Sequence, residues 1–141
     1  MYKDGLDIYV EEHLYETGLT NKDLMRKLRD LGINREEIIA DSAEPKSITE
    51  FERKGFIIKG AKKGPDSIRL GIDVMKRHRI NITKESKNLI KEMQSYKWKT
   101  NRDGNQINEP EANQKDHAID ALRYVCLNKL MENYSGKYYI S

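Results

Sequence analysis

Residues 38–58 of the chain read IIADSAEPKSITEFERKGFII, and this stretch indicates the class of fold. Ile38–Ala40 is a short apolar run, typical of a buried strand in a parallel sheet. Residues 42–55 have the spacing of an amphipathic helix, and Pro45 falls in its first turn, where a missing N–H removes no helical hydrogen bond. A second apolar run follows at Phe56–Ile58. This order of strand, helix and strand predicts an α/β domain with a crossover connection.

The flanking sequence continues the alternation of strands and helices. Thr20 is a predicted helix N-cap, with Asp23 three residues on to complete a capping box. The last predicted helix begins at Asp116, and its apolar stripe consists of Ile119, Leu122, Cys126 and Leu130. The remaining predicted elements are strands at 6–10, 80–82 and 96–99, and helices at 20–31, 67–75 and 86–93.

Length and composition limit the kinds of protein that this chain can be. The 141 residues suit one domain with one modest core, because 35% of them are charged and only 37% are hydrophobic. The single cysteine, Cys126, excludes an internal disulfide and a cysteine-rich zinc site, and is expected to be buried. The sequence contains no apolar stretch of membrane-spanning length and no signal-peptide pattern. We therefore expect a soluble protein of the cytoplasm.

Acidic residues at two distant places are candidates for metal binding. Asp41 ends the Ile38–Ala40 strand, at the edge where open α/β sheets bind ligands, although an aspartate there can also cap a turn. Asp116, His117 and Asp120 fall within one helical turn, so their side chains can share a face. A hard divalent cation would relieve the repulsion between two carboxylates at this spacing. The structural alternative is Asp116 as N-cap and Asp120 in solvent, and His117 is either a ligand, a general base or simply exposed.

Basic residues gather in a glycine-punctuated loop and on the helix that follows it. They could hold a DNA backbone without reading its sequence, and a solvated charged surface is the alternative. Tyr96 and Trp98 alternate with lysines, a pattern that suits either nucleic acid or a half-buried strand. The candidate DNA-binding residues are Lys59, Lys62, Lys63, Arg69, Lys76, Arg77 and Arg79.

Three blocks of sequence carry a family resemblance. They are ADSAEPKSI at 40–48, DHAIDALRY at 116–124 and YVEEHLYETGLT at 9–20, and the basic Lys-Gly loop lies between the first two. In this order they resemble the C-terminal nuclease domain of tailed-phage terminase large subunits, over nearly the whole chain. No phosphate-binding glycine loop is present, so the ATPase motor of such proteins is not on this chain.

The resemblance implies a ribonuclease H-like fold, with a mixed sheet flanked by helices, and metal-dependent cutting of concatemeric double-stranded viral DNA in the cytoplasm of a bacterial host. It implies one or two Mg²⁺ or Mn²⁺ ions held by acidic residues of two strands and the last helix. Carried over, the strand ligand is Asp41; the helix ligand is Asp120 or Asp116, with Asp120 preferred and His117 close to the metal. The implied partners are double-stranded DNA and, in a full-length protein, an ATPase domain, the terminase small subunit and the portal.

The family also has a first catalytic strand, which is expected upstream of the turn at Lys3-Asp4-Gly5. Residues 1–141 are therefore expected to be a partial nuclease domain without that central strand and without the ATPase domain. Asp7, on the next strand, is a poor substitute for the missing aspartate. The alternatives are an inactive remnant that acts as a DNA-binding or assembly module, and another ribonuclease H-like nuclease such as a resolvase.

Overall fold

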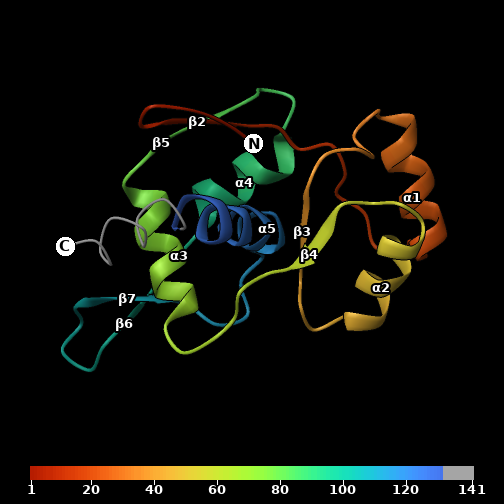
Figure 1. Cartoon of the computed structure of the whole chain (residues 1–141). Helices are drawn as coiled ribbons and strands as arrows, with labels where there is room; N and C mark the ends of the chain where they lie inside the picture. The colour runs from red at the N-terminus through yellow and green to blue at the C-terminus, as the bar shows by residue number, and fades with distance from the viewer. Residues whose placement is uncertain (132–141) are drawn as a thin grey trace, which may run out of the picture. The chain divides into compact units, whose positions relative to one another are not determined.

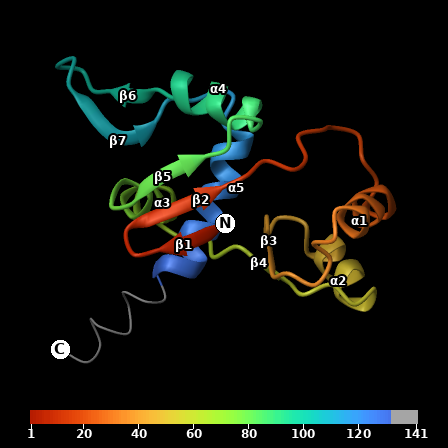
Figure 2. The same ribbon diagram turned by 90° about the horizontal axis from the view of Figure 1, so that it is seen from above.

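The computed structural model describes residues 1–131, which form two compact units. Among these residues, the larger unit contains Met1–Tyr15 and residues 64–131, and the smaller unit contains Glu16–Lys63. Figures 1 and 2 label the helices and strands. No helix of the described residues is both long enough and apolar enough to cross a membrane.

The larger unit is built on a three-stranded sheet. Strand β1 (Tyr2–Asp4) pairs antiparallel with β2 (Asp7–Val10), and β2 pairs in parallel with β5 (Arg79–Ile82). Gly5 has a φ of +60°, which suits the tight turn between β1 and β2. Ile8 of β2 is fully buried, because alternate side chains of a strand face the core. The predicted hairpin entry to this strand is therefore confirmed.

Helices bury the core of the larger unit. The helices are α3 (Ser67–Lys76), α4 (Lys87–Ser95) and α5 (His117–Val125), and α5 continues as a π-helical turn, η1 (Cys126–Leu130). A hairpin of β6 (Trp98–Thr100) and β7 (Gln106–Pro110) joins α4 to α5. The apolar stripe predicted for the last helix is confirmed, because all four of its residues lie in the main core cluster. Burial also raises the pKa of the Cys126 thiol to about 12.

The smaller unit contains the strand–helix–strand segment of residues 38–60. Strand β3 (Ile38–Ala40) and β4 (Ile58–Gly60) pair in parallel, with α2 (Pro45–Arg53) between them and α1 (Asn21–Asp30) before them. A capping box of Thr20 and Asp23 begins α1, as predicted. The parallel pair confirms the crossover connection and the α/β class.

Two details of the structure differ from the sequence-based predictions. Strand β4 begins at Ile58 rather than Phe56, because the Phe56 ring is buried against Phe51 at a centroid distance of 5.1 Å. A single core was expected, whereas the smaller unit has its own cluster of Met25, Phe51 and Phe56.

Candidate functional site

Asp41 lies immediately after β3, at the carboxyl end of the parallel pair. Its Oδ1 accepts a hydrogen bond from the backbone N–H of Ala43 at 3.0 Å and lies 2.5 Å from Nζ of Lys63. The side chain is about half exposed, at 48%. Asp41 therefore caps the turn, as the structural alternative predicted, and still presents its carboxylate to solvent at the edge where a ligand site was predicted.

Gly60 brings the start of the basic loop close to Asp41. Ala40 and Gly60 are paired in register, and the N–H of Ala61 donates to the carbonyl of Ala40 at 2.7 Å. A Cβ at Gly60 would lie only 3.0 Å from Cβ of Ser42, so a larger residue would push this segment away. The absence of a side chain at Gly60 thus keeps the two strand ends together.

Lys59 and Lys63 of the predicted loop form ion pairs within the smaller unit. Nζ of Lys59 lies 3.1 Å from Oε1 of Glu37, and Lys63 pairs with Asp41. Lys62 is exposed. The structure thus places basic charge beside Asp41, where it can hold either that carboxylate or an incoming phosphate.

In the larger unit, the acidic turn of α5 is positioned by Glu92 of α4. Glu92 is buried, with 3% of its surface exposed, and its Oε2 accepts hydrogen bonds from the N–H groups of Ala118 and Ile119 at 2.8 and 3.0 Å. Its Oε1 accepts a hydrogen bond from the Tyr15 hydroxyl at 2.7 Å. Asp116 occupies the N-cap position but its side chain makes no capping hydrogen bond, so the predicted cap role for it is wrong. Glu92 takes that role and leaves Asp116 available for other interactions.

The carboxylates of the acidic turn lie close enough to influence each other. Partial burial, and next the negative charge of Asp120, raise the pKa of Asp116. Asp120 is held by Arg123, whose Nη2 donates to Oδ1 of Asp120 at 2.9 Å. His117 is exposed. The turn therefore gathers two carboxylates and an imidazole, and it carries the electrostatic cost that a bound cation would remove.

Arg123 is itself held in a narrow space between two helices. It is 5% exposed, and its Nε has no hydrogen-bond partner among the described residues. A Cβ at Gly71 of α3 would lie 2.5 Å from Cγ of Arg123, so only glycine leaves room for this side chain. The orientation of Asp120 therefore depends on the packing of α3 against α5.

The residues that position the acidic turn were missed in the sequence. One signal was available for Glu92, because it lies three residues after Leu89 and next to Met93, on the apolar face of its helix. A carboxylate on an apolar face requires a partner, and here the partners are backbone N–H groups. A signal was also available for Arg123, because it lies three residues after Asp120 on the same helix. Tyr15 gave no comparable signal, since its partner Glu92 is distant in sequence.

The predicted site residues are divided between the two units. Asp41, Lys59, Lys62 and Lys63 belong to the smaller unit, and Asp116, His117, Asp120, Arg69, Lys76, Arg77 and Arg79 belong to the larger unit. In the larger unit, Arg69 lies near Asp66 and Asp73, and Nε of Arg79 lies 3.1 Å from Oδ1 of Asp7. No group of three His, Cys, Asp or Glu side chains in residues 1–131 has the arrangement of a metal site.

The sequence of this chain is similar to the sequences of two terminase large subunits. Over 118 residues it is 30% identical to the PBSX phage terminase large subunit of Bacillus subtilis (strain 168), covering 83% of this chain and 27% of that protein. Over 123 residues it is 33% identical to the terminase large subunit of Bacillus phage SPP1, covering 83% of this chain and 28% of that protein. The chain thus spans less than a third of the length of these relatives.

Solved structures agree with the sequence comparison. The g2p large terminase nuclease domain from bacteriophage SPP1, crystallised with bound Mn, matches with a TM-score of 0.76 and 32% identity, over 84% of this chain and 69% of that one. The large terminase of a thermophilic bacteriophage shares the fold, with a TM-score of 0.58, 24% identity and coverage of 79% of this chain and 29% of that one. The family model described as "Terminase RNAseH like domain" matches residues 4–127. The chain therefore belongs to the terminase RNase H-like domain family, and the mixed α/β fold expected from the sequence is confirmed.

Proposed function

We propose that this chain is the nuclease domain of a phage genome-packaging terminase, which cuts concatemeric double-stranded viral DNA with the help of Mg²⁺ or Mn²⁺. The observation that carries the proposal is the acidic turn of α5, where Asp116 occupies the N-cap and Asp120 lies in the first turn of the same helix. The Mn bound in the SPP1 nuclease domain supports the choice of metal. Double-stranded DNA is the proposed substrate, and an ATPase domain, a small subunit and a portal are the proposed partners of the complete packaging protein.

The donor chemistry of the candidate residues fits a hard divalent cation. Carboxylate oxygens are the ligands that Mg²⁺ prefers, and Mn²⁺ also accepts an imidazole nitrogen. We propose Asp41, Asp116, Asp120 and His117 as the ligands, with Asp120 preferred to Asp116 on the helix. Asp41 belongs to the smaller unit, and the acidic turn belongs to the larger unit.

Each side chain has a role that follows from its present contacts. A bound metal would activate water and neutralise charge on the phosphate. Lys63 and Arg123 already hold the carboxylates of Asp41 and Asp120 in fixed orientations. The exposed His117 can accept a proton at a ring nitrogen. Lys62 and Lys63 beside Asp41 can hold the DNA backbone without reading its sequence.

Plasmid nicking in the presence of Mn²⁺ tests the proposal. Asp41→Asn and Asp120→Asn each keep the shape of the side chain and remove a charged ligand. Each is expected to lower the rate of nicking by about 100-fold or more, because the metal would lose a ligand. Asp30→Asn, at an exposed position at the end of α1, is the matched control and should leave the rate unchanged. Nicking that persists in both ligand variants would show that these residues are not the site.

A non-catalytic DNA-binding module is the second candidate function. The observation that favours it is that Asp41 and Asp120 are already paired with Lys63 and Arg123, so each carboxylate has a cation from its own chain. A module of this kind would bind DNA through its basic residues and would not bind Mn²⁺. Loss of free Mn²⁺ signal in a paramagnetic resonance titration, reversed by Asp120→Asn, would favour the nuclease over the module.

A further inference from the structure

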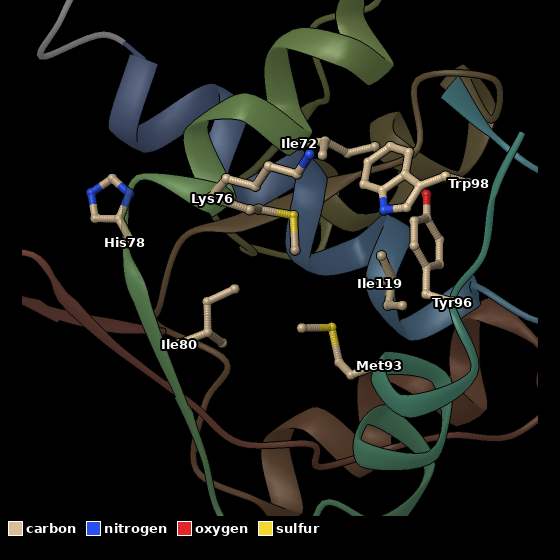
Figure 3. Close-up of a pocket in the computed structure, with 9 residues that line it drawn as sticks. Ile72, Lys76, His78, Ile80, Met93, Tyr96, Trp98 and Ile119 are labelled. Atoms are coloured by element: carbon tan, nitrogen blue, oxygen red, sulfur yellow. The ribbon is translucent and has the colours of Figure 1, made fainter. Parts of the chain in front are cut away.

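The larger unit contains a pocket that the nuclease mechanism does not use. It has a volume of about 370 Å³ and lies between α3, α4, β5, the start of β6 and α5. Its apolar walls include Met75, Ile80, Met93 and Ile119. Figure 3 shows the side chains of Ile80, Met93 and Ile119 around an open centre. A volume in the range of about 300–1,000 Å³ is typical of sites for small ligands. Leaving this much apolar surface in water is unfavourable, so the pocket suits an occupant with apolar faces.

Aromatic side chains form one side of the pocket. Tyr96 and Trp98 meet edge to face, with ring centroids 5.6 Å apart and an interplanar angle of 89°. Figure 3 shows both rings side by side, opposite Ile80. Flat, polarisable side chains of this kind are the surfaces on which nucleobases stack, and they are tolerant of base identity. The pocket is therefore suited to a planar ring rather than to a flexible aliphatic chain.

The polar groups of the pocket are basic. Nζ of Lys76 lies over the Trp98 ring, 4.3 Å from its centroid. His78 is buried, and its Nδ1 lies 2.7 Å from the carbonyl oxygen of Val74. Because a carbonyl only accepts, Nδ1 carries the proton and donates it to the Val74 carbonyl. An occupant that combines a planar ring with a negative charge would match both the aromatic wall and the Lys76 ammonium.

The pocket lies beside the acidic turn of α5. Ile119, one of its wall residues, is in that turn, between Asp116 and Asp120. The pKa of Tyr96 is raised, first by burial and then by the negative charges of Asp116 and Asp120. Tyr96 therefore borders both the pocket and the proposed metal ligands. A nucleotide in the pocket would lie next to the place where a phosphate is proposed to be cut.

We propose that this pocket binds one unpaired nucleotide of the DNA substrate, with its base against Trp98 and Tyr96 and its phosphate at Lys76. The inference rests on the proposed function, since DNA supplies the nucleotide. A base within a duplex is stacked on its neighbours, so the pocket would take a base that is frayed, extruded or single-stranded. An apolar side chain of a protein partner is the competing occupant, and it would offer no negative charge to Lys76.

Trp98 reports on its own pocket, because it is the only tryptophan in the sequence. The experiment titrates the whole chain with a short oligothymidylate and, separately, with a blunt hairpin duplex, and follows tryptophan fluorescence. EDTA is present throughout, so neither metal binding nor cleavage contributes to the signal. The oligothymidylate is expected to quench the fluorescence at concentrations roughly tenfold lower than the duplex, because base stacking on an aromatic ring is lost in the duplex.

Two variants test the pocket in different ways. Lys76→Met removes the charge and keeps the length of the side chain, and Ile80→Phe fills the cavity. Each is expected to weaken oligothymidylate binding by roughly tenfold, while Lys91→Met, at an exposed position on α4, should not change it. Thermal unfolding followed by circular dichroism shows whether Ile80→Phe still folds, and Lys76→Met carries the test if it does not.

Equal quenching by both DNAs, with no effect of either variant, would overturn the proposal. Binding of the neutral apolar dye Nile red in place of DNA, blocked by Ile80→Phe, would also overturn it and would assign the pocket to an apolar side chain of a protein partner. Failure of the proposed nuclease function gives a different experimental result from failure of the proposed nucleotide pocket. A protein that does not nick plasmid but still binds oligothymidylate in EDTA keeps this inference and loses the nuclease proposal.

Discussion

Glu92 is the single residue on which the start of α5 most depends. A buried carboxylate is stable only when hydrogen bonds replace its hydration, and here two backbone N–H groups and one hydroxyl do so. The positive end of the helix dipole favours the same placement. Because the acidic turn begins at these N–H groups, the positions of Asp116 and Asp120 follow from a residue that is distant in sequence.

Replacing Glu92 should therefore cost more stability than replacing its hydroxyl partner. Glu92→Ala leaves the N–H groups of Ala118 and Ile119 without their acceptor, so the free energy of unfolding is expected to fall by about 2–3 kcal/mol. Tyr15→Phe removes one hydrogen bond at the edge of the same group and should cost about 1 kcal/mol. Urea unfolding followed by circular dichroism measures both. Equal stabilities for Glu92→Ala and the native chain would show that Glu92 does not hold α5.

At the level of elements, the contact between α3 and α5 determines how Asp120 is presented. The two helices approach closely where Gly71 faces Arg123, and Arg123 in turn holds Asp120. Close approach of this kind requires glycine, which has no side chain. Glycine also has a low helix propensity, so its presence lowers the predicted helicity of α3. Periodicity alone predicts the helix correctly, and it does not predict this use of glycine.

Gly71→Ala is expected to separate the two helices or to displace Arg123. The new Cβ would lie 2.5 Å from Cγ of Arg123, and overpacking of this kind costs about 1–3 kcal/mol. Gly64→Ala is the matched control, because no atom lies within 4 Å of a Cβ at that position and its φ is not positive. Unfolding in urea should show a loss of stability for Gly71→Ala alone. A stable Gly71→Ala protein would mean that α3 and α5 adjust without strain.

At the level of the whole molecule, the sequence predicts local elements better than it predicts how they are combined. The capping box at Thr20, the strand at Ile38–Ala40 and the stripe on α5 are all set by neighbours in sequence, and all are confirmed. Strand β7 was not predicted, since residues 100–115 are polar and its pairing with β6 is its main constraint. The division into two units, and the packing of Arg123 against Gly71, depend on contacts that no local pattern encodes.

The π-helical turn after α5 has a consequence for the comparison of sequences. A π turn holds more residues than an α turn, so it adds length to the helix and shifts the face on which later side chains lie. A relative whose last helix stays α-helical throughout would need one residue fewer in the stretch Cys126–Leu130 to keep the same faces inward. An alignment gap inside this helix would then mark the gain or loss of a π turn. If the gap were removed, every residue after it would be aligned with the wrong residue of the relative.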